Sequence, residues 1–384
     1  MFVSHLKVRN WRNFPIIDVD FQKRLFIIGP NASGKSNLMD IFRFLRDIAK
    51  PEGGGLQKAV ADRGGMAKIR NLAARRDPDI SIEIRFSDSP EGNGTFRYEL
   101  GLKQQARGRR NTLVSYERVS RNTEIILNRP NQDDYEDIIR LTQTYLEQIA
   151  VNQKFRDIVK FFQTITYSHF VPSLFRHTNM IRGIRGGDDP YGQDFLENMA
   201  RENERTRRAR LSRIEQVLKL AVPRIEHLEF IRDQVTGQPH LQVLYPHWRP
   251  RAGIQQEDQL SDGTLRLIGI LWSLLDGDSL LMLEEPELNL HSGIVKQLAA
   301  IILRVQQNTG RQVLISTHNP ELLADSNVNG QEVLLLKPIL EGSEAFIVTE
   351  VSDAFLTLER DAVEEQLMIN KTRTENLDQL NLFE

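Results

Sequence analysis

Lys35 and Ser36 close a glycine-containing octet, GPNASGKS, which begins at Gly29 directly after the apolar run RLFII. The octet fits the pattern G-x-x-x-x-G-K-[ST]. In this pattern the backbone N–H groups turn toward phosphates, the lysine reaches the β and γ oxygens, and the hydroxyl binds Mg²⁺. The following residues, SNLMDIFRFLRDIA, have the apolar spacing of a helix with one buried face. This context disfavours the alternative, a glycine-rich turn with an incidental lysine.

The octet therefore predicts binding of a nucleoside triphosphate, ATP, together with Mg²⁺. We assign Lys35 to catalysis as well, because it reaches the oxygens of the transferred phosphate, and we expect Ser36 to be a metal ligand. The expected nucleotide contacts are the octet and the residue after it, namely Gly29, Pro30, Asn31, Ala32, Ser33, Gly34, Lys35, Ser36 and Asn37.

Two adjacent carboxylates follow the second strongly apolar segment, in LLMLEEPELNLH. A buried strand that ends in acids would bring Glu284 near the metal and would let Glu285 polarise the attacking water. Taken alone, the segment fits solvated acids at the end of a strand equally well. Together with the octet it favours a catalytic pair, with Glu284 as a metal ligand and Glu285 as the catalytic base.

Two further segments, QLSDGT before an apolar helix and LISTHNP after an apolar strand, are weak signals separately. Ser-Asp-Gly is an ordinary helix start, and a lone histidine is usually structural. The order and spacing of all four segments resemble ABC-type ATPases. The resemblance implies that Ser261 and Gly263 cap the γ-phosphate bound to another subunit, and that His318 is the catalytic switch histidine.

The resemblance is greatest to the RecF/SMC/Rad50-like branch. The opening stretch LKVRNWRNFPIIDVDF is similar to the first hairpin of that branch, in which Asn10 and Arg12 match positions near the nucleotide. The segments EEPELNLH and STHNPELL resemble the ATPase part of OLD-family proteins and ATPase subunits of bacterial antiphage systems. Arg12 is therefore added to the expected nucleotide-binding residues.

The sequence departs from the ABC pattern at several positions. Glu284 replaces the usual aspartate, and His291 stands where an aspartate of the dimer contact usually falls. Asp262 and Thr264 replace the glycine and glutamine of the signature loop. Gln57 is one candidate for the glutamine of the lid loop.

The predicted fold class is α/β, a P-loop NTPase of ABC-ATPase type, with a mixed sheet core, an antiparallel β subdomain and an inserted helical subdomain. We expect an N-terminal ATPase lobe over 1–130 and a helical insert over 131–222. A C-terminal ATPase lobe over 223–350 and a helical or disordered tail over 351–384 would complete the chain.

Composition limits the remaining function classes. The 384 residues include 50 basic and 52 acidic side chains, so attraction to nucleic acid would depend on local patches. The absence of cysteine excludes disulfides, thiolate metal sites and a cysteine nucleophile. The longest apolar run, LIGILWSLL, is far shorter than the ~20 residues that span a bilayer. We therefore expect a cytoplasmic protein without a membrane partner.

A signature loop acting on its partner's nucleotide implies self-association, as a dimer or higher oligomer with ATP at the interface. Only 66 residues follow His318, and no acidic cluster of Toprim type fits there, so any nuclease activity would belong to a separate effector. The leading hypothesis is an ATPase that senses a trigger and controls such an effector, a nuclease or toxin, in antiphage defence. The alternatives are a RecF-like DNA-repair ATPase and a nucleotide-gated scaffold with negligible turnover.

The stretch RENERTRRARLSR is a candidate surface for DNA phosphates through Arg205, Arg207, Arg208 and Arg210. A solvated helix face is an equally good interpretation, because glutamates offset part of the charge. The last residues, NLDQLNLFE, are either a docking peptide for a partner or, more often for such an end, a frayed tail.

Overall fold

The computed structural model describes residues 1–74, 78–88, 96–105, 110–176, 189–222, 224–249 and 252–352. The predicted tail over 351–384, the C-terminal peptide included, therefore lies almost entirely outside the described residues. Within the described ranges, no helix combines the length and the apolar character needed to cross a bilayer.

An antiparallel sheet forms most of the N-terminal part. Its strand order is β2-β1-β4-β5-β6-β7. The strands are β1 (Phe2–Trp11), β2 (Phe14–Asp20), β4 (Ile80–Ser87), β5 (Phe96–Gln104), β6 (Thr112–Arg121) and β7 (Glu124–Arg129). Alternation of buried apolar and more exposed side chains along β4 and β5 shows that one face of this sheet packs on the core. This is the antiparallel extension of the first lobe that the alternating sequence predicts.

A central, mostly parallel sheet has the strand order β15-β14-β3-β13-β12-β8. The strands are β3 (Arg24–Ile28), β8 (Thr166–Ser168), β12 (Leu281–Glu284), β13 (Val313–Thr317), β14 (Val333–Ile339) and β15 (Gly342–Ile347). Only β15 is antiparallel to its neighbour. The carboxyl ends of β3, β12 and β13 therefore meet at one edge of the sheet, where ligands bind in α/β folds of this kind.

The remaining elements are helices and a small separate sheet. The long helices are α1 (Lys35–Ala49), α8 (Glu204–Ala221), α9 (Asp262–Leu275) and α10 (Ser292–Thr309). The short helices are α2 (Leu56–Ala61), α3 (Met66–Ile69), α4 (Gln132–Glu136), α5 (Arg156–Gln163), α6 (Pro172–Arg176) and α7 (Phe195–Arg201), with 3-10 helices η1 (Ile138–Thr142), η2 (Gln153–Phe155), η3 (Glu257–Gln259), η4 (Pro320–Leu323) and η5 (Gly330–Glu332). The small sheet, β11-β10-β9, comprises β9 (His227–Arg232), β10 (Pro239–Leu244) and β11 (Ile254–Gln256).

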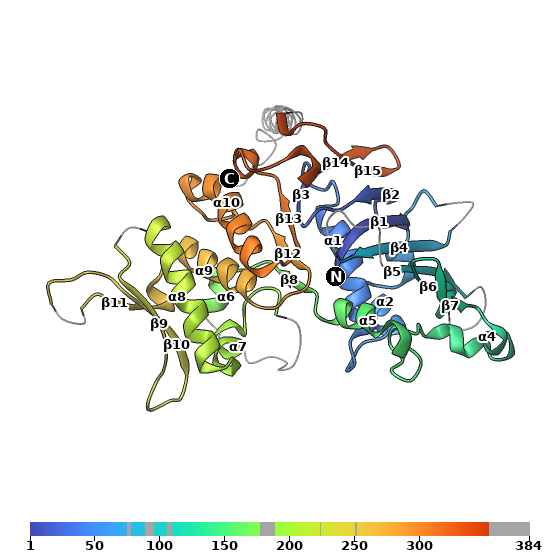
Figure 1. Cartoon of the computed structure of the whole chain (residues 1–384), viewed down its shortest axis with the longest axis horizontal. Helices are drawn as coiled ribbons and strands as arrows, with labels where there is room; N and C mark the ends of the chain where they lie inside the picture. The colour runs from blue at the N-terminus through green and yellow to red at the C-terminus, as the bar shows by residue number, and fades with distance from the viewer. Residues whose placement is uncertain are drawn as a thin grey trace, which may run out of the picture.

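The central sheet separates two apolar cores. Leu25 and Ile27 of β3 belong to the core that α1 and the antiparallel sheet cover, whereas Phe26 and Ile28 belong to the core beneath α9 and α10. Figure 1 shows these two layers on opposite sides of the central strands. Alternate residues of a strand point to opposite faces, so a fully apolar run is required wherever both faces are covered.

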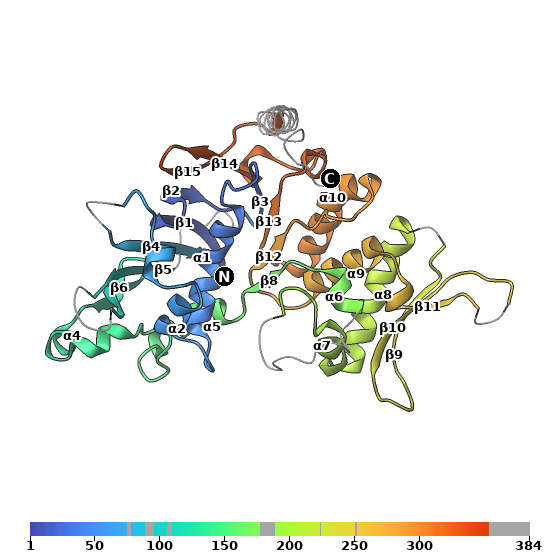
Figure 2. The same cartoon turned by 180° about the vertical axis from the view of Figure 1, so that it is seen from behind.

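The range 131–222 differs from the single helical insert expected from the sequence. Strand β8 divides it and pairs in parallel with β12 at the edge of the central sheet. The part before β8 packs into the first core, and the part after it packs into the second. A strand of three residues is too short to show a period, which is why the surrounding helical pattern concealed it. Strands β9 and β10, which fall in the range 223–350 expected to be the C-terminal ATPase lobe, form the small sheet that stands out from the body (Figure 2).

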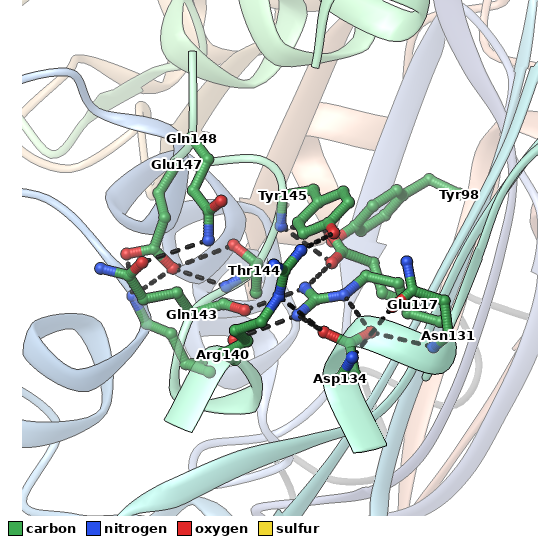
Figure 3. Close-up of polar contacts among 12 residues, drawn as sticks. Tyr98, Glu117, Asn131, Asp134, Arg140, Gln143, Thr144, Tyr145, Glu147 and Gln148 are labelled. Carbon is green, nitrogen blue, oxygen red and sulfur yellow. Dashed lines mark hydrogen bonds and ion pairs between the residues drawn. The ribbon is translucent and has the colours of Figure 1, made fainter. Parts of the chain in front are cut away.

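A buried ionic network ties the segment after β7 to the antiparallel sheet (Figure 3). The Arg129 guanidinium contacts Glu117 at 3.0 Å and Asp134 at 2.8 Å, and all three side chains are fully buried. The same guanidinium lies 3.9 Å from the ring centroid of Tyr145, and the Tyr98 hydroxyl donates to Glu117 at 3.1 Å. Burial raises the pKa of Glu117, although the Tyr145 N–H and Arg129 oppose that effect.

Candidate functional site

The octet forms a tight loop between β3 and α1. Gly29, Ala32 and Gly34 have φ angles of 154°, 64° and 102°, in the left-handed region that favours glycine. A Cβ on Gly34 would lie 2.2 Å from Nδ2 of Asn13, so packing also requires glycine there. The Lys35 ammonium donates to the carbonyl oxygens of Gly29 at 2.8 Å and Pro30 at 3.1 Å. The 15-residue helix α1 directs its first N–H groups and its partial positive charge at this loop, which suits a phosphate.

Ser36 and Glu284 meet where α1 faces the end of β12. The Ser36 hydroxyl donates to Oε1 of Glu284, and the hydroxyl of Tyr167 donates to Oε2. Burial raises the pKa of Glu284, while the Ser36 hydrogen bond and the charges of Arg43 and Lys35 act in the opposite direction. The hydrogen bond from Tyr167 is a contact that sequence reasoning did not predict.

This donor set fits Mg²⁺. A hydroxyl and a carboxylate are hard oxygen ligands, and Mg²⁺ is usually held by one or two such groups plus substrate phosphates. In the described part of the chain, no group of three or more His, Asp or Glu side chains could hold a metal by itself. The pair Ser36 and Glu284 is thus suited to a metal that arrives with a nucleotide.

Glu285 and His318 form the second polar pair of this edge. Nδ1 of His318 lies 3.2 Å from Oε1 of Glu285, and both side chains are partly exposed. Glu285 has a φ of 44°, and its N–H donates to the carbonyl oxygen of Ser316 on β13 at 3.0 Å. Its own carbonyl accepts from the buried Arg266 at 3.1 Å, which links it to α9. Burial lowers the pKa of the Arg266 guanidinium.

Asn13, in the turn between β1 and β2, holds the octet loop from outside. Its Nδ2 donates to the carbonyl oxygen of Ser33 at 2.8 Å and to the hydroxyl of Ser343 at 2.9 Å. Its Oδ1 accepts from Nδ2 of Asn37 at 2.8 Å. Sequence reasoning missed this residue, because an asparagine between two short strands indicates only a turn.

Arg12 and Asn10, the hairpin residues implied by resemblance, have different surroundings. The Arg12 guanidinium pairs with Asp40 at 2.6 Å and contacts Asn37 at 3.4 Å. Arg12 lines a cavity of about 1010 Å³ beside the first turn of α1. The buried Asn10 instead donates to the carbonyl oxygen of Asp79 at 2.8 Å. Arg12 is thus within reach of a ligand in the cavity, whereas Asn10 supports the backbone.

Ser261 and Gly263 lie at the start of α9, away from the octet of the same chain. The Ser261 hydroxyl caps the helix by accepting from the N–H of Thr264 at 3.2 Å. A Cβ on Gly263 would lie 2.8 Å from the carbonyl oxygen of Asn289, which requires glycine for close packing. Across the described ranges, no hydrogen bond joins Ser261 to residues 29–37, and Figure 1 shows α9 and α1 on opposite sides of the central sheet.

Gln57 and His291 have local structural roles. The Gln57 amide donates to the carbonyl oxygens of Thr112 at 2.8 Å and Thr142 at 2.7 Å, and accepts from the N–H of Thr112 at 3.2 Å. These contacts connect α2 to β6 and η1. Nδ1 of His291 accepts from the N–H of Gly293 at 3.2 Å and caps α10.

Arg207 and Arg210 of the basic stretch are engaged within the protein. Arg207 donates to three carbonyl groups at the end of α7 and just beyond it, and its guanidinium lies 4.4 Å from the ring centroid of Phe230. Arg210 pairs at 2.9 Å with both Glu202 and Asp276. These contacts leave little of either cation for a phosphate backbone.

Arg208 and Arg205 face solvent. Arg208 pairs with Glu204 at 2.9 Å in an i,i+4 arrangement, with both side chains largely exposed. Arg205 is also exposed. Such an exposed pair contributes little stability and can be exchanged for another anion.

The family described as "AAA domain, putative AbiEii toxin, Type IV TA system" matches residues 25–324. "DNA replication and repair protein RecF" of Bacillus cytotoxicus is 27% identical over 88 residues, which cover 23% of this chain and 24% of that protein. The RecF protein of Bacillus mycoides is also 27% identical over 88 residues, with the same coverage of both chains. The chain thus spans about a quarter of the length of the curated relatives it matches.

Two solved structures share the fold. The Smc head domain with a coiled coil and joint from Pyrococcus yayanosii has a TM-score of 0.52 at 10% identity, covering 94% of this chain and 99% of that one. An SmcHead bound to the C-winged helix domain of ScpA has a TM-score of 0.51 at 14% identity, covering 92% and 100%. The matched family, the RecF relatives and this fold lead to one conclusion. The chain belongs to the family described as "AAA domain, putative AbiEii toxin, Type IV TA system" and is an ABC-type ATPase of the RecF/SMC/Rad50-like branch.

Proposed function

We propose that this protein binds ATP with Mg²⁺ and hydrolyses it to ADP and phosphate. The observation that carries the proposal is the meeting of three strand ends, which brings the octet loop, the two carboxylates and His318 to one edge. The octet N–H groups and Lys35 bind the phosphates, and Ser36 and Glu284 hold the metal, which neutralises charge on the phosphate oxygens. Glu285 orients the attacking water and accepts its proton, and His318 orients Glu285.

Glu285→Gln tests the proposed hydrolysis. We expect the rate of ATP hydrolysis to fall by about 100-fold or more, because the amide cannot accept a proton, while the affinity for ATP changes little. Steady-state phosphate release and equilibrium nucleotide binding measure the two effects. Glu321→Gln is the matched control, because that carboxylate lies just beyond His318 and pairs only with Lys296 at 3.6 Å among its described neighbours. An unchanged rate in Glu285→Gln would contradict the proposal.

We further propose that two chains associate with ATP between them, with Ser261 and Gly263 of one chain facing the nucleotide of the other. In the described part of the chain no hydrogen bond joins Ser261 to the octet, and α9 and α1 lie on opposite sides of the central sheet, which supports this arrangement. To change a monomer–dimer balance from 1:99 to 99:1, nucleotide binding must favour the dimer by about 5.5 kcal/mol. The mass in solution of the Glu285→Gln protein should therefore rise when Mg-ATP is added. A mass that stays monomeric would remove the basis for a role of Ser261 across an interface.

The proposed biological role is control of a separate effector, a nuclease or toxin, in antiphage defence. The matched family's description, which names a toxin of a type IV toxin–antitoxin system, supports this role. Expression together with neighbouring reading frames should protect bacteria from phage, and Lys35→Ala should abolish protection. If protection persists in Lys35→Ala but hydrolysis is lost, nucleotide use is not the switch. If it persists in Glu285→Gln, the chain is a nucleotide-gated scaffold.

The RecF relatives support a second candidate, an ATPase that binds DNA. Arg205 and Arg208 are the exposed cations of the basic stretch, so they are the residues to test. Reversing both charges should weaken DNA binding and reduce its dependence on salt concentration. DNA affinity that is absent at low salt, or unaffected by the reversal, would argue against this candidate.

A further inference from the structure

Tyr167 contacts the metal-binding carboxylate from the neighbouring strand. Strand β8 pairs in parallel with β12, with Tyr167 opposite Met282, two positions before Glu284. The tyrosine is 6% exposed, and its hydroxyl donates to Oε2 of Glu284. Since Oε1 accepts from Ser36, both carboxylate oxygens have a neutral hydroxyl donor.

Arg43 fixes the tyrosine from the other side. Its guanidinium lies 4.3 Å from the ring centroid of Tyr167, a cation–π distance. Arg43 follows Ser36 by seven residues on α1, about two helical turns, so both side chains lie on the same face. Helix α1 therefore contacts the Glu284 carboxylate directly through Ser36 and indirectly through the ring of Tyr167.

A glutamate at this position needs such support. Its side chain has one more rotatable bond than the aspartate usual in ABC-type ATPases, and each free torsion that must be fixed costs free energy. A carboxylate held through one oxygen presents the other in a defined direction. Groups that orient metal ligands in this way commonly affect metal affinity or activity by 10–100-fold.

We propose that Tyr167, held by Arg43, is a positioning residue that directs Oε1 of Glu284 toward Ser36 and the Mg²⁺ of bound ATP. The inference rests on the proposed ATPase function. It adds to metal binding a residue that lies outside the octet, the acidic segment, the signature loop and the histidine segment.

Tyr167→Phe removes only the hydroxyl and keeps the ring beneath Arg43. In a Glu285→Gln background, binding of a fluorescent ATP analogue is titrated with Mg²⁺. We expect the Mg²⁺ concentration that gives half of the maximal increase in nucleotide binding to rise by about 10–100-fold. The affinity for the nucleotide without Mg²⁺ should stay within about twofold of the value before the Tyr167→Phe change. Tyr98→Phe is the matched control, because Tyr98 makes an equivalent buried contact with Glu117 far from the octet. It should leave the Mg²⁺ requirement unchanged.

Arg43→Lys provides a second test if Tyr167→Phe folds poorly. The substitution keeps the charge but weakens the stacking, so we expect a smaller rise in the Mg²⁺ requirement, about two- to fivefold. Glu284→Asp shortens the carboxylate beyond the reach of Tyr167. In that background, Tyr167→Phe should have an effect of less than about twofold, because the two residues act as a unit.

The outcomes separate this inference from the proposed function. A wild-type protein that shows no Mg²⁺-dependent nucleotide binding would overturn the proposed function and this inference with it. Normal Mg²⁺-dependent binding in the wild type, with the same Mg²⁺ requirement in a folded Tyr167→Phe protein, would overturn only the inference. An equal effect of Tyr98→Phe would show that stability, and not orientation of Glu284, had been measured.

Discussion

Asn13 shows how a single uncharged side chain can control a phosphate-binding loop. Its side chain forms hydrogen bonds with the Ser33 carbonyl of the loop, with Asn37 on α1 and with Ser343 near the start of β15. The loop conformation contains three residues with positive φ, which is costly unless its surroundings impose it. Asn13 is therefore part of what maintains the loop conformation that we propose for phosphate binding.

We predict that Asn13→Ala weakens ATP binding by about fivefold, the effect of losing about 1 kcal/mol of hydrogen bonding that preorganises the loop. Asn13→Asp should weaken it too, because a carboxylate cannot donate to the Ser33 carbonyl. Calorimetric titration with ATP measures the affinity. Asn128→Ala, at an exposed asparagine of β7, is the control, and an Asn13→Ala protein with wild-type affinity would refute the argument.

The octet and the two acids could be located from the sequence, since each combines a residue pattern with the strand or helix that places it. Tyr167, Asn13 and Arg266 could not. Each reaches the site through hydrogen bonds from another segment of the chain, and neither a tyrosine in ITYSH nor an arginine in an apolar helix carries a pattern. Such contacts depend on tertiary packing, which local spacing does not encode.

Asp134 allows a prediction about pH. Burial disfavours its charged form, but the hydrogen bonds from Arg129 and from the Asn131 N–H outweigh burial and hold the pKa of Asp134 below its ordinary value. A depressed folded-state pKa stabilises the protein above about pH 4, and this contribution is lost as pH falls through the folded-state value. Asp134→Asn should therefore destabilise the protein by about 3–5 kcal/mol at pH 7.

Urea unfolding of both proteins from pH 7 down to pH 3 measures this difference. It should begin to shrink below about pH 4, where the Asp134 carboxylate of the unfolded chain takes up a proton that the folded chain still resists. A constant difference across the range would mean that shape, and not charge, determines the effect. Asp133→Asn is the control, because the Asp133 side chain is 62% exposed.

At the scale of elements, the end of α7 and its neighbour α8 give the basic stretch a structural meaning. A helix leaves its last carbonyl groups without intrahelical partners, and a cation there is favourable. Arg207 of α8 donates to carbonyls at that end and stacks on Phe230 of β9, so it joins three elements. The sequence indicated a basic helix but not which arginines face inward, because the stretch has no clear apolar stripe.

We predict that Arg207→Ala lowers the free energy of unfolding by about 1–3 kcal/mol, since it removes the donor to three part-buried carbonyl groups and the contact with the ring of Phe230. Arg208→Ala, one position later on the same helix, should change it by less than about 0.5 kcal/mol, because its ion pair with Glu204 is exposed. Chemical denaturation of the two variants compares them directly. Equal effects would show that the contacts of Arg207 do not support the fold.

The strand β8 marks the limit of prediction at this scale. The apolar runs of β3, β12 and β13 correctly predicted buried strands of the sheet core, because both faces of these strands are covered. The three residues of β8 are too few to show any period, so the sequence did not reveal a core strand inside the range expected to be helical. The strand matters nonetheless, because it carries Tyr167 to the edge where Glu284 lies.

For the whole molecule, the two-layer arrangement determines what one chain can do alone. The octet lies with α1 on one side of the central sheet, and Ser261 lies at the start of α9 on the other. If two chains complete each other's sites, a chain with a damaged octet still offers an intact Ser261 to its partner. We therefore predict that Ser261→Arg and Lys35→Ala, each inactive alone, recover ATP hydrolysis when mixed.

The expected recovery follows from counting sites. In a random equal mixture half of the dimers are mixed, and each mixed dimer has one intact site in two, so hydrolysis should reach about a quarter of the wild-type rate in a symmetric dimer. Ser261→Arg mixed with Gly263→Arg is the control, because both changes damage the same surface and cannot complement. Recovery in the control, or none in the test mixture under conditions where the wild type associates, would contradict sharing of sites.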